Sequence, residues 1–195
     1  MSDLIEKVRR ALEKPAPPSS DFDLNAGVVL PEGRKLRPAA VLVLLTPEGR
    51  VILTKRAAQL KHHPGQIAFP GGKQDEADAS LWACAVREAE EEIGLDAANV
   101  EQLGALPLHE TVTSFVVSPQ VALLTKPQDF TPNEGEVAEV FEVPLTHVLD
   151  PARFMVQGRM WQGAIRNFYT VPYGPYYIWG ATACMLRGLA DRVQL

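Results

Sequence analysis

The stretch REAEEEIGL, residues 87–95, decides how the rest of this sequence is interpreted. It places five charged side chains within six positions of a segment that otherwise has the apolar spacing of a helix packed on a core. Like charges three or four residues apart are neighbours on a helix and destabilise it by about 0.2–0.5 kcal/mol per pair. Something in the folded protein should offset that repulsion.

A single helix is predicted over residues 81–93. At about 100° per residue, its apolar side chains form one continuous arc that faces the core. Glu88 and Glu91 lie beside that arc, Glu92 lies just inside its edge, and Glu90 points to solvent. Three carboxylates are therefore expected on one strip of the helix surface.

A bound cation is the economical way to offset this charge. Arg87 lies four residues before Glu91 and can pair with it, but one guanidinium cannot neutralise three carboxylates. The helix dipole near Gly94 disfavours negative charge still further. Mg²⁺ or Mn²⁺ suits a site built from carboxylates alone. The alternative is that the glutamates form a plain hydrophilic helix face, which is the commonest meaning of such a run.

The composition describes one compact domain with a substantial core. The chain has 195 residues, of which 46% are hydrophobic and 22% charged. It contains neither an apolar run of about 18 residues nor a secretory signal, and its net charge of −5 argues against nucleic-acid binding. Cys84 and Cys184 fall in apolar helical patterns and are expected to be reduced, buried thiols. We therefore expect a cytoplasmic protein that binds a small molecule, without membrane or nucleic-acid partners.

Strands outnumber helices in the expected order of elements. A helix over residues 3–13 is followed by a proline-rich linker, so residues 1–35 are expected to pack on a domain that spans residues 36–195. Strands are expected over residues 39–46, 51–56, 66–72, 99–108, 115–124, 136–145, 154–163 and 166–173, the first two as a hairpin. A closing helix is expected within residues 176–193. This order predicts an α/β or α+β fold around a mixed sheet.

A basic stretch precedes the helix. Between Glu48 and Asp75 there is no acidic residue, whereas the basic side chains there include Arg50, Lys55, Arg56, Lys61, His62 and His63. Each of them alone is explained by a solvated loop. Together, beside a possible metal site, they favour an anionic ligand.

The segment GGKQDEADASLWACAVREAEEEIGL, residues 71–95, resembles the signature of the Nudix hydrolases. The second half of that signature is matched without a gap by Arg87, Glu88, Ala89, Glu91, Glu92, Gly94 and Leu95. In the first half Asp78 replaces a glutamate, and eight rather than seven residues separate it from Arg87. Asp78 is therefore expected either to cap the helix or to support the site.

A second segment narrows the resemblance. ILTKRAAQLKHHPGQIAFPGG, residues 52–72, resembles the segment that precedes the signature in the coenzyme A diphosphatases of this family, and IWGATA, residues 178–183, also resembles that branch. Lys61 stands where the pattern usually has arginine, which keeps the charge but not the two-pronged phosphate grip. The resemblance spans most of residues 38–190. It implies a Nudix-type α/β/α sandwich around a mixed sheet.

The resemblance also implies a reaction. This is metal-dependent hydrolysis of the diphosphate bond of coenzyme A, or of an acylated or oxidised form, to 3′,5′-ADP and 4′-phosphopantetheine. Glu88, Glu91 and Glu92 are the expected ligands of Mg²⁺ or Mn²⁺, and Arg87 is expected to orient Glu91. Glu136 is the candidate general base, with an exposed strand-edge glutamate as an equally good interpretation.

Substrate contacts are expected from the basic stretch and the glycines. Lys55, Arg56 and Lys61 would bind phosphate, and Gly71 and Gly72 would let the backbone approach the ligand. The alternatives are a Nudix enzyme for another diphosphate, such as ADP-ribose or a dinucleotide, and a non-catalytic ligand sensor. A sensor would usually have lost metal ligands, and all three remain.

Several conspicuous residues receive structural interpretations or none. The aromatic side chains of Trp161, Tyr173 and residues 176–179 are interpreted as packing rather than as adenine-binding groups. His109 is placed in a loop that could line the cleft, and the sequence does not decide its role. The sequence also leaves open the oligomeric state, the physiological metal and the purpose of the N-terminal helix. It does not decide whether free or acylated coenzyme A is the preferred substrate.

Overall fold

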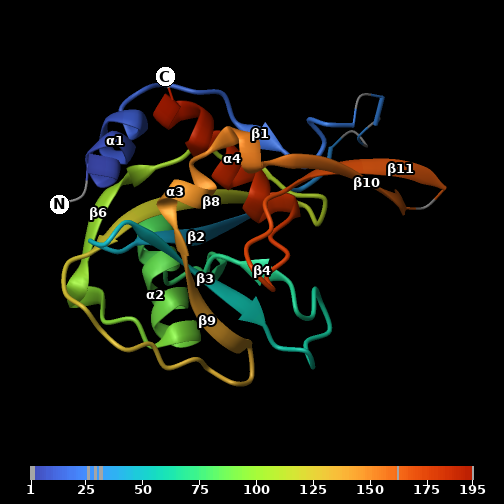
Figure 1. Ribbon diagram of the computed structural model, residues 1–195. Helices are drawn as coiled ribbons and strands as arrows, with labels where there is room; N and C mark the ends of the chain where they lie inside the picture. Colours follow the sequence, from blue (N-terminus) through green and yellow to red (C-terminus); the bar gives the residue numbers. More distant parts are fainter. Residues whose placement is uncertain (1–2, 26, 29, 31–32, 162, 195) are drawn as a thin grey trace.

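The computed structural model has helices on both faces of a mixed sheet. It describes residues 3–25, 27–28, 30, 33–161 and 163–194. Helix α2 (Leu81–Ile93) covers one face, and α1 (Asp3–Leu12) and α4 (Gly180–Gln194) cover the other (Figure 1). The predicted α/β/α sandwich is confirmed.

The main sheet combines parallel and antiparallel pairs in the order β1-β7-β8-β2-β3-β4, with β5 on β2, β6 on β8 and β9 on β3. Its strands are β1 (Ser19–Ser20), β2 (Arg37–Leu45), β3 (Arg50–Arg56), β4 (Ile67–Ala68), β5 (Gly71–Lys73), β6 (Val100–Ala105), β7 (His109–Glu110), β8 (Phe115–Leu124) and β9 (Val137–Pro144). Strands β2 and β8 pair in parallel at the centre, and β2 forms the expected antiparallel hairpin with β3. Because helices cover both faces, the central strands are almost wholly apolar.

Strand alternation divides the core into two layers. Leu42 and Leu44 of β2 pack with α2, whereas Val43 and Leu45 of the same strand pack on the side of α1 and α4. Helix α1 is fastened to α4 through Arg192, whose Nη2 donates to the main-chain carbonyls at the C-terminal end of α1, among them that of Ala11 at 2.6 Å. The N-terminal helix is therefore part of the packed body.

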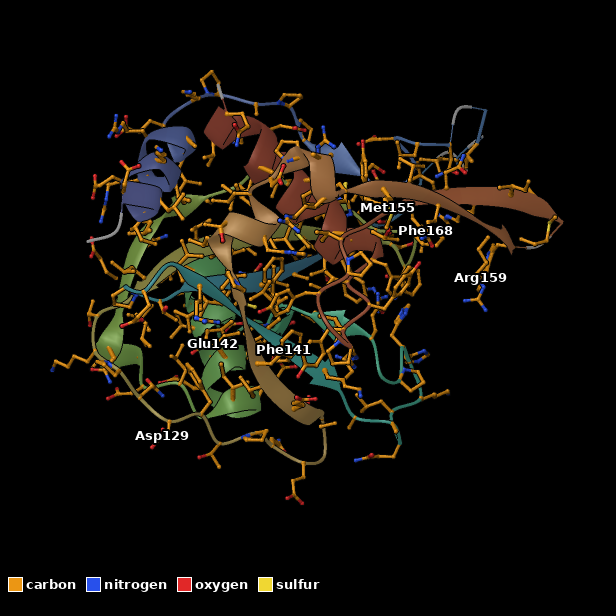
Figure 2. The ribbon with its side chains drawn as sticks, viewed as in Figure 1. Asp129, Phe141, Glu142, Met155, Arg159 and Phe168 are labelled. Carbon is orange, nitrogen blue, oxygen red and sulfur yellow. The ribbon has the colours of Figure 1, made fainter. Side chains whose placement is uncertain are left out.

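A two-stranded hairpin, here called the arm, stands apart from the main sheet. It consists of β10 (Met155–Trp161) and β11 (Ala164–Thr170) and projects from the body (Figure 1). Figure 2 shows Arg159 extending from it, well outside the layer that holds Phe141. The short helices α3 (Leu145–Val148), η1 (Ala97–Asn99) and η2 (Pro151–Arg153) complete the structure.

Two expected elements differ from the structure. The closing helix begins at Gly180 rather than near Tyr176, because main-chain hydrogen bonds such as Val171 N–H to Ile178 O at 2.9 Å hold residues 176–179 extended. The expected linker contains β1, which pairs in parallel with β7. No helix in the described residues is long and apolar enough to cross a membrane.

Candidate active site

Helix α2 begins and ends where its capping residues require. The Ser80 hydroxyl accepts a hydrogen bond from the Ala83 N–H at 3.1 Å and caps the N-terminus. At the other end Gly94, with φ +66°, takes the left-handed conformation and donates to Glu90 O at 3.0 Å. Because Ser80 is the cap, Asp78 is free for another role.

Asp78 holds Arg87 in a two-pronged ion pair. Arg87 Nε and Nη2 each lie 2.9 Å from one oxygen of Asp78. Arg87 Nη1 reaches Glu88 Oε1 at 3.0 Å and Glu91 Oε2 at 3.2 Å. Hydrogen bonding from Arg87 and from the Asp75 N–H holds the pKa of Asp78 well below its usual range. Asp78 therefore supports the site, and the expected pairing of Arg87 with Glu91 is present.

Glu92 is a buried carboxylate beneath the glycine loop. Glu92 is only 5% exposed, and the Gly71 N–H donates a hydrogen bond to its Oε2 at 3.0 Å. Burial raises the pKa of Glu92 to about 7, although the Gly71 N–H acts in the opposite direction. Burial also raises the pKa of half-buried Glu88 in spite of its contact with Arg87. Glu90 is exposed, as expected.

The two glycines make room for these carboxylates. A Cβ built on Gly72 would overlap the carboxylate of Glu88, and one built on Gly71, where φ is +151°, would overlap the backbone of Ala40 and Val41. Any larger residue at position 72 would displace Glu88. The Gly71 N–H is already committed to Glu92, so Gly71 acts on the site through that carboxylate.

Glu136 and Arg56 approach the same carboxylates from the end of β3. The Ala57 N–H donates to Glu136 O at 2.8 Å. The negative charge of Glu136 raises the pKa of both Glu88 and Glu92, and the positive charge of Arg56 opposes this at Glu92. Arg56 Nε is buried and donates to no atom in the described part of the chain. We call Glu88, Glu92 and Glu136, with the adjoining glycines, the acidic edge.

The acidic edge has the donors that a hard cation requires. Carboxylate oxygens are the preferred ligands of Mg²⁺ and Mn²⁺, and burial leaves Glu92 short of compensating charge. Within the described ranges no three His, Cys, Asp or Glu side chains already converge on one point. The expected cluster of three glutamates is therefore not preformed, because Arg87 holds both Glu88 and the largely exposed Glu91.

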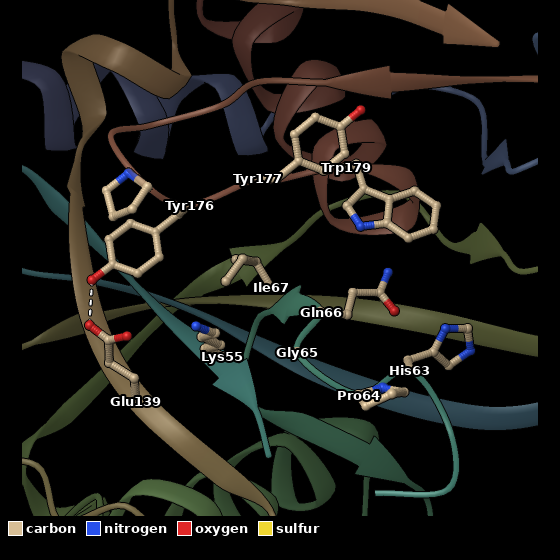
Figure 3. Close-up of a pocket in the computed structure, with 11 residues that line it drawn as sticks. Lys55, His63, Pro64, Gly65, Gln66, Ile67, Glu139, Tyr176, Tyr177 and Trp179 are labelled. Carbon is tan, nitrogen blue, oxygen red and sulfur yellow. Dashed lines mark hydrogen bonds between the residues drawn. The ribbon is translucent and has the colours of Figure 1, made fainter. Parts of the chain in front are cut away.

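A cavity of about 500 Å³, here called the aromatic pocket, lies on the other side of β3. Successive strand residues point to opposite faces, so Lys55 lines this pocket whereas Arg56 acts on Glu92. The walls come from β3, β9, residues 63–67 and residues 175–179. Figure 3 shows Lys55, Glu139 and Tyr176 on one side and His63, Gln66 and Trp179 on the other.

The aromatic walls of this pocket are held in place by neighbouring residues. The ring of Tyr176 stacks on Phe141 with centroids 3.6 Å apart, and its hydroxyl donates to Glu139. Trp179 meets Phe168 edge to face at 5.1 Å. Tyr176 and Trp179 therefore pack on neighbouring rings, as expected, and together with Tyr177 they also line a cavity.

The basic stretch is not one patch. Arg50 pairs with Glu142 at the far end of β3, at 3.4 Å, and Lys61 lies exposed in the loop before residue 63, outside the lining of the aromatic pocket. Strand geometry separates Lys55 from Arg56, as described above. His109, expected in a loop, is instead fully buried in β7.

Comparison with known proteins identifies the family. A family model described as the NUDIX domain matches residues 35–161. The chain belongs to the Nudix hydrolase family. It is 42% identical over 159 residues to "Uncharacterized Nudix hydrolase NudL" of Cronobacter sakazakii, covering 80% of this chain and 83% of the relative. A protein of the same description from Citrobacter koseri is 39% identical over 176 residues, covering 89% and 92%.

A solved structure agrees in fold. The crystal structure of a MutT protein from Methanosarcina mazei superposes with a TM-score of 0.53 at 19% identity, covering 83% of this chain and 95% of that one. Nudix hydrolases act on phosphoric anhydrides in small nucleotide derivatives and generally need divalent cations. This chain is accordingly a Nudix hydrolase of a diphosphate substrate.

Proposed function

We propose that this Nudix hydrolase splits the diphosphate bond of coenzyme A to 3′,5′-ADP and 4′-phosphopantetheine, with Mg²⁺ or Mn²⁺ bound by Glu88, Glu91 and Glu92. The observation that carries the proposal is the acidic edge itself: two partly or fully buried carboxylates face the glycine loop beside the Arg56 Nε–H, which has no partner among the described residues. A buried donor without a partner is costly, and a phosphate oxygen would satisfy it.

The residues in and around the acidic edge each have a role in this proposal. Glu136 accepts the proton of the attacking water, and Arg87, fixed by Asp78, orients Glu91. Arg56 binds a phosphate oxygen, and Gly72 lets the backbone approach the diphosphate. A bound cation would supply charge stabilisation between the carboxylate and phosphate oxygens.

Coenzyme A is favoured as substrate by the segment of residues 52–72 and by the aromatic pocket. Part of that segment, from His63 to Ile67, lines the pocket together with Lys55, so one stretch of chain serves both sides of β3. The pocket has the volume and the aromatic walls of a site for a nucleoside or a similarly sized group. The two free cysteines of the protein, Cys84 and Cys184, suit the reducing conditions of the cytoplasm, where we place the protein.

The second candidate is hydrolysis of another nucleoside diphosphate derivative, such as ADP-ribose or a dinucleotide. The same acidic edge serves any diphosphate, so this candidate differs only in what the aromatic pocket accepts. A non-catalytic sensor is a lesser candidate, because Glu88, Glu91 and Glu92 are all retained.

A substrate panel tests the proposal. Purified protein with Mg²⁺, and separately with Mn²⁺, is incubated with coenzyme A, acetyl-coenzyme A, ADP-ribose and a diadenosine polyphosphate, and the products are separated by chromatography. We expect coenzyme A or its acyl form to have the highest kcat/KM and to release 3′,5′-ADP. Faster turnover of ADP-ribose or the dinucleotide would favour the second candidate, and no turnover in the whole panel would favour the sensor.

A further inference from the structure

The arm carries two arginines directly opposite each other. In the antiparallel pairing of β10 with β11, Arg159 is the partner of Arg166, so both side chains leave the same face. Like charges in this position repel each other and destabilise a strand pair. In the part of the chain that the structure describes, neither makes an ion pair with an acidic side chain. Figure 2 shows Arg159 extending from the underside of the arm in that view.

The same face of the arm forms one wall of a second cavity. This cavity, here called the arm pocket, has a volume of about 150 Å³ and is lined by both arginines and by Trp161 and Phe168 from the arm. From the body it is lined by Trp179 and His63, which also line the aromatic pocket. The two cavities are therefore adjacent.

One acidic residue, Asp21, also lines the arm pocket, but its charge is already offset. Its Oδ1 lies 3.1 Å from His109 Nε2, and its Oδ2 accepts from the Val112 N–H at 3.0 Å. Burial alone would lower the pKa of His109, yet hydrogen bonds to Asp21 and Cys184 raise it to about 9. The raised pKa favours the protonated form of His109, whose Nε2 faces Asp21. The arginines remain the uncompensated charge of this cavity.

The arm is also connected to the aromatic pocket through side chains. The Tyr177 hydroxyl donates to Gln157, which lies on the same face of β10 as Arg159. Arg166 lies over the ring of Phe22, with its guanidinium carbon 5.3 Å from the ring centre. The arm face is therefore positioned over the body rather than turned away from it.

We propose that Arg159 and Arg166 bind a phosphate monoester of the substrate that is separate from the diphosphate at the acidic edge. The inference rests on the proposed function, because coenzyme A carries such a group on its ribose. Paired guanidinium groups bind a dianionic phosphate through several charge-assisted hydrogen bonds, and the anion removes their mutual repulsion. The nucleoside would then lie between the two cavities, along Trp179.

Comparison of coenzyme A with dephospho-coenzyme A tests this assignment. The values of kcat/KM for both substrates are measured for wild type, Arg159→Gln, Arg166→Gln and the double variant. Arg153→Gln is the matched control, because Arg153 is an exposed arginine at the base of the arm that pairs with Asp150. We expect each single variant to lose about 10-fold on coenzyme A and less than about 2-fold on dephospho-coenzyme A. A preference for coenzyme A that survives in the double variant would overturn the inference while leaving the proposed function intact.

A binding measurement keeps the two ideas separate. If wild type hydrolyses neither substrate, the proposed function fails for coenzyme A. Calorimetry with 3′,5′-ADP and 5′-AMP then tests whether the arm binds a phosphate monoester. We expect wild type to bind 3′,5′-ADP about 10-fold more tightly than 5′-AMP and the double variant to bind both alike. Equal binding of the two ligands by wild type would refute the role of the arm. Melting temperatures at or above the wild-type value are expected for the variants, since each removes like-charge repulsion.

Discussion

The acidic edge and the aromatic pocket lie on opposite sides of β3, and the chain builds them in different ways. Glu88, Glu92 and the glycines of the acidic edge come from residues 71–92, a single strand–loop–helix unit, and Glu136 joins them from the residue before β9. The aromatic pocket and the arm pocket draw on segments spread from Asp21 to Gly180. The difference indicates that a local motif can supply the chemistry while separate segments determine which molecule is accepted.

The two regions also differ in how their charges are balanced. At the acidic edge, buried Glu92 and half-buried Glu88 have raised pKa values, so their negative charge lacks full compensation. In the aromatic pocket the Glu139 carboxylate accepts a hydrogen bond from the Tyr176 hydroxyl, and the Tyr176 ring stacks on Phe141. The charge of the acidic edge thus lacks a partner that a cation would provide, whereas the Glu139 carboxylate of the aromatic pocket already has one. Changes at the first should lower kcat, and changes at the second should raise KM.

The largest effect is expected at the acidic edge. Glu92→Gln should lower kcat by about 10²-fold or more, because the amide cannot ligate a cation as the carboxylate does. The same order of loss is expected for Glu91→Gln. Glu90→Gln is the matched control, since it removes the same charge from the exposed side of the same helix. Wild-type turnover in Glu92→Gln would show that the acidic edge is not the chemical site.

Loss of the Asp78 carboxylate, which holds Arg87, should have the next largest effect on kcat. Asp78→Asn breaks the two-pronged pair and should lower kcat by about 30-fold, which lies in the range for residues that orient a metal site. Asp78→Glu, which restores a carboxylate, should recover part of the loss. If both variants lost activity equally with unchanged melting temperatures, Asp78 would not act through Arg87.

A pocket substitution sharpens the contrast in kinetic terms. Trp179→Leu should raise KM by about 10-fold with little change in kcat, because stacking on a nucleobase contributes about 1–3 kcal/mol. Initial-rate kinetics over a range of substrate concentrations separate the two constants. A fall in kcat at constant KM would place Trp179 with the chemistry instead, and the division across β3 would then be incorrect.

Replacement of His109 should have the smallest effect on turnover. Its effect on the unfolding free energy should depend most clearly on pH. The His109 pKa of about 9 exceeds the ordinary 6.5, so its contribution to stability is fully present below pH 6.5 and is lost as the pH rises through 9. The difference in unfolding free energy between wild type and His109→Gln should therefore shrink by roughly 3 kcal/mol between pH 6 and pH 10. Denaturant titrations at both values measure it. A constant difference would mean that His109 is neutral in the fold.

The sequence predicts the acidic edge better than the pockets, for physical reasons. The bounds of α2 depend on Ser80 and Gly94, which act locally, and the burial of Glu92 follows from helix periodicity. The separation of Lys55 from Arg56 also follows from strand alternation, although the composition of the basic stretch favours a single patch. In these cases the decisive interactions join residues that are close in the chain.

Contacts between distant segments account for what sequence reasoning missed. Residues 176–179 fit a helical pattern, but hydrogen bonds from Val171 and Tyr173 hold them extended as a pocket wall. The pairing of Asp78 with Arg87 required the geometry of the loop, because the spacing allowed either role. The sequence predicts strands for both halves of the arm, but the common cavity of Arg159, Trp161 and Trp179 depends on contacts between distant segments.

Metal binding by the acidic edge is the central claim, and Mn²⁺ titration followed by electron paramagnetic resonance tests it most directly. Wild type and Glu90→Gln should remove free Mn²⁺ from the spectrum with the same affinity, whereas Glu92→Gln should bind it at least about 10-fold more weakly. Removal of the buried charge should leave the fold of Glu92→Gln at least as stable as wild type without metal. Equal Mn²⁺ affinity in all three folded proteins would contradict the account.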